Sequence, residues 1–70
     1  MNEGEFSDLH PYFEAQDQCI SYMYEPRASL VKNGWIREVV RGAFQITPKG
    51  IAAVQRIIDG KASLTEGGYE

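Results

Sequence analysis

The sequence predicts a small α+β domain built in the order helix, short helix, β-hairpin, helix. Apolar residues recur at helical spacing after residue 11 and again after residue 50. Between them, β-branched and aromatic residues gather in two short runs separated by a glycine. A chain of 70 residues forms one domain at most. We expect that domain to span 11–60, with an acidic flexible arm over 1–10 and a flexible tail over 61–70.

The first helix is predicted at about residues 11–24. Pro11 suits the first helical turn, where its missing N–H has no helical partner to lose. The apolar stripe that follows has helical period and consists of Tyr12, Phe13, Ala15, Cys19, Ile20, Tyr22 and Met23. Not every aromatic residue of the run 22–24 can be buried in so small a domain, so part of it is a candidate dimer or partner surface.

Pro26 ends the first helix and begins a short one over 26–33, because the residue before a proline avoids the helical region. Ala28, Leu30 and Val31 are expected to point inward. Gly34 follows as a left-handed C-cap, a conformation that favours glycine.

A β-hairpin is predicted from strands at 35–40 and 43–47, joined by Arg41-Gly42. Its inner face is expected to carry Trp35, Val39, Phe44 and Ile46, and its exposed positions Arg37, Glu38, Arg41 and Gln45. For Trp35, closing the core and anchoring a partner at the surface are the two readings, and core is preferred.

The last helix is predicted from Thr47 as N-cap and Pro48 at the first helical position to Gly60, which ends it. Ile51, Val54, Ile57 and Ile58 recur at helical spacing and form its expected apolar face.

Charge is segregated along the chain. Residues 1–25 carry six acidic side chains and no Lys or Arg, residues 26–59 have a net charge of +4, and the whole chain has −3. Local potential steers association more than total charge does. Either the acidic segment lies beside the basic one and neutralises it, or the basic segment presents its charge to a partner.

Neither catalysis nor metal binding is predicted. Cys19 and His10 are the only cysteine and histidine, which excludes an internal disulfide and makes a four-ligand zinc site implausible. Cys19 is expected to be a buried, inert thiol. We expect no enzyme activity and no cofactor, and the absence of an apolar run of membrane-spanning length indicates a cytoplasmic protein.

The stretch from Leu30 to Ile51 resembles part of a known fold. Leu30–Ile36 is similar to the end of a recognition helix running into a first wing strand, and Arg41–Gly50 to the second wing strand and the start of the next helix. This pattern resembles the winged helix-turn-helix domain of MarR-type and PadR-type regulators, and most closely the N-terminal domain of Mrr-type restriction endonucleases. The resemblance implies a small winged-helix-like domain.

The resemblance also implies binding of duplex DNA by the short helix 26–33 and the wing 37–42, in a transcriptional regulator acting as a homodimer. The DNA-binding residues it implies are Arg27, Ser29, Lys32, Asn33, Arg37 and Arg41. Arg and Lys neutralise phosphates, and Arg or Asn can pair with base edges.

Two alternatives stay open at this point. The wing arginines are equally explained as a solvated hairpin edge, where charge discourages aggregation, and the helix cations as ordinary surface charge. The whole domain has an alternative interpretation, ranked after DNA binding, as a protein–protein interaction module that uses its acidic and aromatic N-terminal half.

Overall fold

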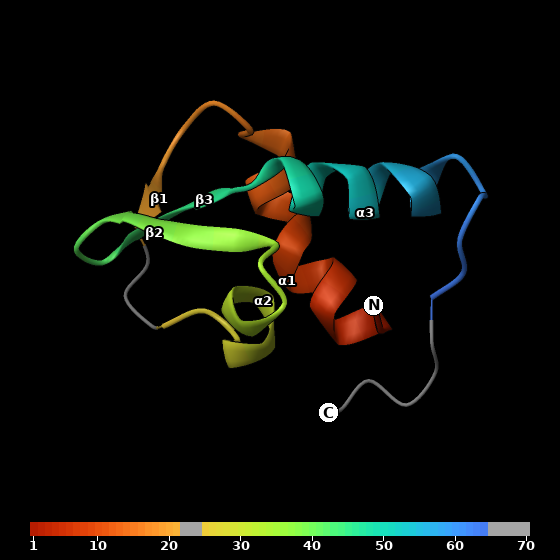
Figure 1. The fold of residues 1–70 in the computed structure, drawn as a ribbon, viewed down its shortest axis with the longest axis horizontal. Coiled ribbons are helices and arrows are strands. Elements are labelled where there is room, and N and C mark those ends of the chain that lie inside the picture. Colours follow the sequence, from red (N-terminus) through yellow and green to blue (C-terminus); the bar gives the residue numbers. More distant parts are fainter. Residues whose placement is uncertain (22–24, 65–70) are drawn as a thin grey trace.

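The computed structural model describes residues 1–21 and 25–64, in which three helices and a three-stranded antiparallel sheet form a small α+β domain (Figure 1). The predicted α+β class is confirmed. The elements follow in the order α1 (Glu3–Glu14), β1 (Ile20–Ser21), α2 (Ala28–Lys32), β2 (Ile36–Val40), β3 (Ala43–Ile46) and α3 (Pro48–Ile58). No helix in the described residues is long and apolar enough to cross a membrane.

Helix α1 corrects the expectation of a flexible arm over residues 1–10. It begins at a capping box, in which the Asn2 side chain accepts from the Glu5 N–H at 2.7 Å and the Glu5 carboxylate accepts from the Asn2 N–H at 2.9 Å. Both residues are buried, and Leu9 is fully buried. An Asn followed three residues later by Glu is a helix-start signal, and it outweighs the acidic composition that suggested an arm.

The expected helix over 11–24 is also wrong, because α1 already contains Pro11 in its interior and ends at Glu14. A turn follows, in which the Gln18 N–H donates to the Ala15 carbonyl. The chain then forms β1, whose Ile20 pairs with Phe44 of β3. Pairing with a distant strand thus decides the conformation of a segment whose local spacing favours helix. The aromatic run 22–24 lies outside the described residues.

The second half of the chain agrees closely with its prediction. Helix α2 ends at Lys32 and is followed by Gly34 at a φ of 77°. Strands β2 and β3 form the expected hairpin around Arg41-Gly42, and Gly42 has a φ of 83°. Helix α3 begins at Pro48 after Thr47 as its N-cap. Each of these boundaries has a local chemical signal, which explains why the sequence predicted them.

The sheet has the strand order β1-β3-β2, so β2 is an edge strand. In β2, Ile36 is buried and pairs with Ile46, whereas Val39 is exposed, contrary to its expected place on the inner face. The register shifts between Glu38 and Val40. A bulge of this kind interrupts the alternation of side chains, which is why the inner face could not be extended from Ile36 to Val39.

The core lies where α1, α2, α3 and the base of the hairpin meet. Its buried members are Leu9, Tyr12, Leu30, Ile36, Ile46 and Val54, and Trp35 and Phe44 pack against them partly buried. Besides Val39, three residues that were predicted to face inward are exposed, namely Ala28, Val31 and Ile58. The core is too small to cover every apolar residue of the short helix α2, so Leu30 is the one residue of this helix that is buried.

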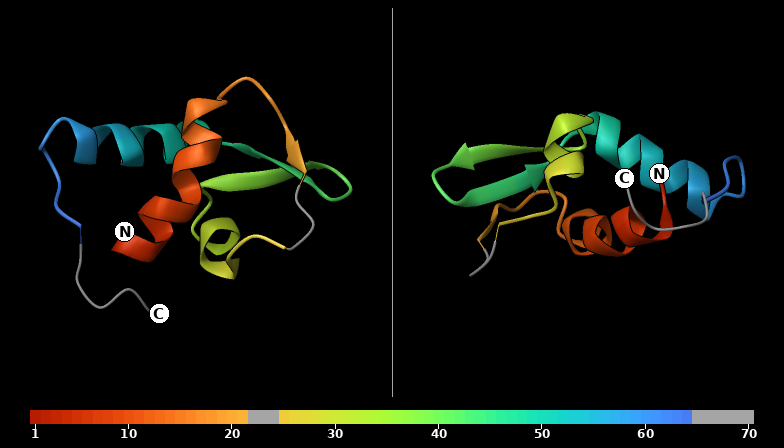
Figure 2. Two further views of the ribbon diagram at one scale, coloured as in Figure 1. Left: turned by 180° about the vertical axis from the view of Figure 1, so that it is seen from behind. Right: turned by 90° about the horizontal axis from the view of Figure 1, so that it is seen from below.

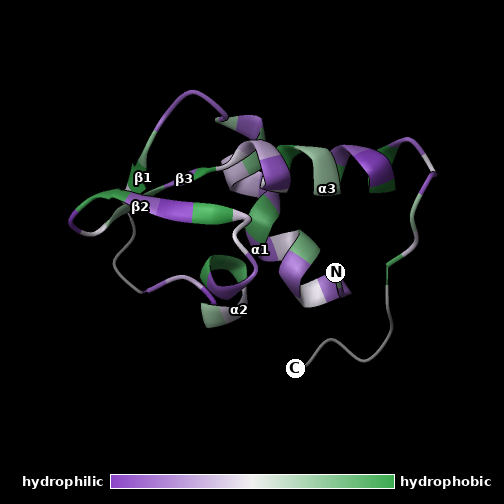
Figure 3. Ribbon diagram, in the orientation of Figure 1, coloured by the Kyte–Doolittle hydropathy of each residue, from purple (hydrophilic) through white to green (hydrophobic). Residues whose placement is uncertain are grey.

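Seen from below, the hairpin and α3 lie in one layer and α1 in another (Figure 2, right). Helix α1 contacts both α3 and β3. Figure 3 shows apolar residues at the base of β2 and polar residues along its middle. The hairpin therefore projects from the core with a polar central section.

The start of α3 is clamped onto the backbone at Trp35. The Thr47 hydroxyl lies within hydrogen-bond distance of the carbonyls of Gly34 and Trp35 and accepts from the Gly50 N–H at 3.1 Å. The Thr47 N–H donates to the Trp35 carbonyl at 2.9 Å. A Cβ at Gly50 would overlap that carbonyl oxygen and would come within 2.8 Å of the Ile46 side chain. Glycine is required there because the helix approaches the backbone so closely.

Leu9→Ala is expected to lower the free energy of unfolding by about 2–5 kcal/mol, the usual cost of such a truncation at a fully buried position. Urea denaturation followed by circular dichroism measures the change. Ser7→Ala, at an exposed position of the same helix, serves as the control and is expected to change stability by less than about 0.5 kcal/mol. Equal stability of both variants would show that α1 is a dispensable arm.

Thr47→Val is expected to cost about 1–2 kcal/mol, because it removes the N-cap of α3 and the hydroxyl bonds to the preceding turn while keeping the side-chain volume. Thr47→Ser keeps the hydroxyl and is expected to retain most of the stability. The same denaturation assay compares the two variants, and a Ser variant as unstable as the Val variant would contradict the clamp.

Candidate nucleic-acid interface

Arg27, the first of the predicted DNA contacts, is engaged within the fold. It occupies the N-cap position of α2, and its Nε lies 2.8 Å from the Asp8 Oδ2 of α1. Both side chains are partly exposed, so the pair contributes little to stability. Its structural effect is to hold the Arg27 guanidinium toward α1.

The Asn33 side chain and the Ser29 carbonyl form a hydrogen bond with each other at the end of α2. The Asn33 amide folds back and donates to the Ser29 carbonyl at 2.9 Å, beside the Asn33 N–H, which donates to the same carbonyl. The Ser29 Oγ is buried and has no hydrogen-bond partner among the described residues. The structure therefore does not present these two side chains together as a polar reading surface.

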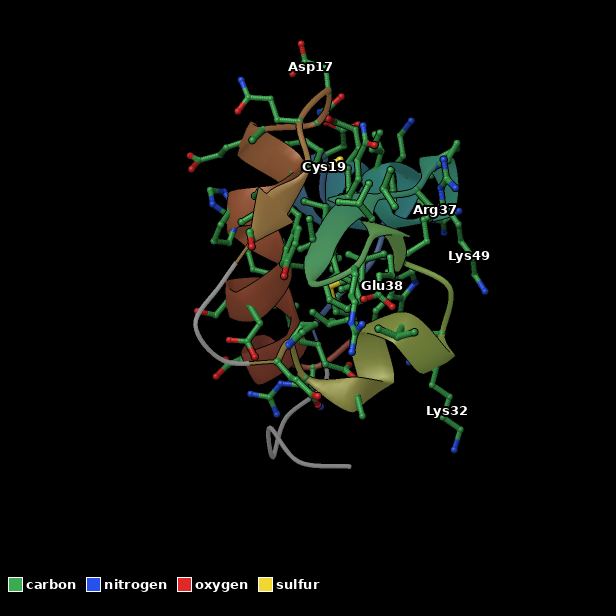
Figure 4. All side chains as sticks on the ribbon, turned by 90° about the vertical axis from the view of Figure 1, so that its left-hand side faces the viewer. Asp17, Cys19, Lys32, Arg37, Glu38 and Lys49 are labelled. Atoms are coloured by element: carbon green, nitrogen blue, oxygen red, sulfur yellow. The ribbon has the colours of Figure 1, made fainter. Side chains whose placement is uncertain are left out.

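Lys32, Arg37 and Lys49 do come together on one side of the molecule. They extend from the end of α2, the middle of β2 and the start of α3, and Figure 4 shows all three along the same side, away from α1. All three are exposed. Within the described part of the chain, none of them forms an ion pair. We call these three side chains the basic ridge.

Lys49 was not among the residues predicted from sequence. A Cβ at Gly34 would lie 3.8 Å from the Lys49 Cδ and 4.0 Å from its Nζ, so the side chain passes over the turn that follows α2. The clamp between Thr47 and Trp35 brings it there. The Thr-Pro-Lys-Gly helix start was visible in the sequence, but its position beside Gly34 depends on a contact across 13 residues.

Lys49 also lies in the first turn of α3, which contains no acidic residue. A helix N-terminus carries a partial positive charge and normally favours Asp or Glu. Lys49 adds to that positive potential rather than opposing it. This placement costs a little helix stability and concentrates positive charge at one end of the basic ridge.

Arg41 occupies the hairpin turn and is exposed. The turn itself is fixed by the Gly42 N–H, which donates to the Glu38 carboxylate at 2.8 Å, and by the Ser21 hydroxyl, which donates to the Gly42 carbonyl at 3.3 Å. Arg41 is therefore an exposed residue of an anchored turn.

The acidic first third of the chain does not neutralise this cationic surface. In the described residues, Arg27 is the one Lys or Arg that pairs with a carboxylate, that of Asp8. Glu3 and Glu14 are exposed on α1, and Asp17 lies in the turn after it, apart from the basic ridge in Figure 4. The acidic side chains of α1 and of the turn after it are thus separated from the basic ridge, whereas Glu25 and Glu38 share a groove with Lys32.

A groove of about 500 Å³ lies between α2 and the hairpin. Its apolar lining includes Ala28, Val31 and Phe44, and Glu25, Lys32 and Glu38 supply its charged groups. Glu38 lies at the centre of the view in Figure 4, between the hairpin and α2. The groove adjoins the basic ridge at Lys32.

The remaining candidate residues, Cys19 and His10, belong to no cluster of metal-binding side chains among the described residues. Cys19 is exposed, contrary to the expected buried thiol, because β1 places it at the surface beside Gln45. His10 is half-buried, with its Nδ1 3.7 Å from the Glu14 carboxylate. Among the described residues, no group of three His, Cys, Asp or Glu side chains could hold a metal ion.

No model of a known protein family matches this chain, and neither does a curated protein or a solved structure.

Proposed function

We propose that this protein binds duplex DNA through the basic ridge and the hairpin turn, as a small winged-helix-like protein suited to transcriptional regulation. The single observation that carries the proposal is the alignment of Lys32, Arg37 and Lys49, unpaired within the described residues, on the side away from acidic α1 (Figure 4). Unpaired cations on one side of a protein attract the phosphates of nucleic acid.

The order of the elements supports the same proposal. A short helix, α2, leads directly into a projecting antiparallel hairpin, and α3 returns to the end of α2. A helix beside a hairpin of this kind is the arrangement in which winged helices contact DNA. One ridge buries little surface on a duplex, so we expect two copies to bind together when affinity is high.

The decisive comparison is between the triple variant Lys32→Ala/Arg37→Ala/Lys49→Ala and the single variant Lys61→Ala. Lys61 follows the far end of α3, whose last residue, Ile58, lies about 13.5 Å along the helix from Lys49. Fluorescence anisotropy with a labelled 20-base-pair duplex at 50 mM salt measures binding. The triple variant is expected to raise the Kd at least about 100-fold, because each lost charged contact is worth roughly 1 kcal/mol.

Lys61→Ala is expected to change the Kd less than about twofold, since one remote charge is largely screened at this ionic strength. Circular dichroism establishes that all variants are folded. If the triple variant binds as well as the original protein, or if the original protein does not bind, the basic ridge is not a DNA interface.

A second candidate function, protein interaction, is favoured by the groove between α2 and the hairpin. Its apolar lining and its two carboxylates, from Glu25 and Glu38, fit an apolar side chain flanked by a cation. Titration of labelled protein with a peptide of alternating Leu and Lys tests it. Chemical shifts moving at Val31 and Phe44, with duplex DNA causing none at the basic ridge, would favour this function over the first.

A further inference from the structure

Helix α2 lacks the side chains needed to read base edges. Base-specific contact relies on groups such as an Arg fork or an Asn amide held free in the major groove. Here the Arg27 guanidinium is bound to Asp8, and the Asn33 amide is bound to the Ser29 carbonyl. Both of the groups best suited to base recognition are already used within the fold.

The dimensions of α2 lead to the same conclusion. The helix has five residues and is therefore roughly 7.5 Å long, which corresponds to about two base-pair steps of B-DNA at roughly 3.4 Å each. Its exposed positions include Ala28 and Val31, which offer no hydrogen bond, and Lys32 at its end. The helix is too short to lay a row of polar side chains along the bases.

The basic ridge consists mainly of groups that recognise charge alone. Lys32 and Lys49 end in flexible ammonium groups, which act as point charges, and Arg37 alone carries a planar fork. The three side chains come from three different elements. Such a set is suited to phosphates, which fix the position of a protein on DNA but carry no sequence information.

The surface also favours a duplex over a single strand. Proteins that hold single strands stack the bases on exposed aromatic rings. In the described part of the chain, the exposed large hydrophobic side chains are Val31, Val39, Val40 and Ile58, and none is aromatic. Among the described residues near the basic ridge, the rings of Trp35 and Phe44 are partly buried against the core, so neither is a fully exposed platform for a base.

We propose that the basic ridge binds the phosphate backbone of duplex DNA without reading its base sequence. This inference rests on the proposed DNA-binding function and specifies its substrate as any B-form duplex. Lys49 is an essential part of this recognition, because it supplies the third charge and is held in place by the Thr47 clamp.

The first test is selection of bound duplexes from a random 20-base-pair pool, followed by measurement of the Kd for selected and unselected duplexes. We expect less than about a tenfold difference, whereas a sequence-specific protein binds its site 10³-fold or more tightly than other DNA. A selected site bound tenfold or more tightly would overturn sequence independence while leaving DNA binding intact. Absence of binding to every duplex at 50 mM salt would instead overturn the proposed function.

The second test is the dependence of binding on salt. Four phosphate contacts in each bound copy, from the basic ridge and Arg41, predict a slope of about −3.6 in log K against log salt concentration, or roughly a 150-fold loss of affinity between 50 and 200 mM salt. Lys49→Ala is expected to reduce the slope by about 0.9, equally for unrelated duplexes. Lys61→Ala should leave it unchanged. A Lys49→Ala variant with the original slope, or with losses confined to one duplex, would contradict this part of the inference.

Discussion

Thr47 and Gly50 hold the start of α3 against the carbonyl of Trp35, and the other elements depend on this contact. It joins the end of the hairpin to the turn after α2, so that three separate segments meet at one point. Gly50 permits the approach because a side chain there would overlap the carbonyl oxygen. The single hydroxyl group of Thr47 forms hydrogen bonds both with the N-terminus of α3 and with the turn after α2. The geometry of the basic ridge is a consequence of this joint.

Burial of α1 explains how an acidic chain presents a cationic surface. Its fully buried leucine and its capping box fix the helix on the side of the core away from the basic ridge. The exposed carboxylates of α1 therefore lie on a different side from the basic ridge, and among the described Lys and Arg residues only Arg27 pairs with a carboxylate, that of Asp8. A net charge of −3 describes the whole chain, whereas a partner encounters the local potential of one face.

Helix α2, whose sequence resembles the end of a recognition helix, mainly packs against and bonds to other parts of the fold. Leu30 fills the core, Arg27 ties α2 to α1, and Asn33 closes the end of the helix. These internal uses leave the positive charge of neighbouring elements as the main feature of the proposed interface. A fold and its resemblance to a known domain do not specify a mode of recognition, because recognition depends on which side chains the packing leaves free.

The sequence by itself determined the helix ends, the hairpin and the glycine positions of residues 26–60, because caps, prolines and left-handed glycines act over a few residues. The sequence also contains the capping-box residues Asn2 and Glu5 that start α1, although its acidic composition suggested a flexible arm there. Of the basic ridge, Lys32 and Arg37 could be predicted, but Lys49 could not. Strand β1, the exposure of Cys19 and the position of Lys49 beside Gly34 were decided only by the tertiary structure, because each depends on contacts between residues more than ten positions apart.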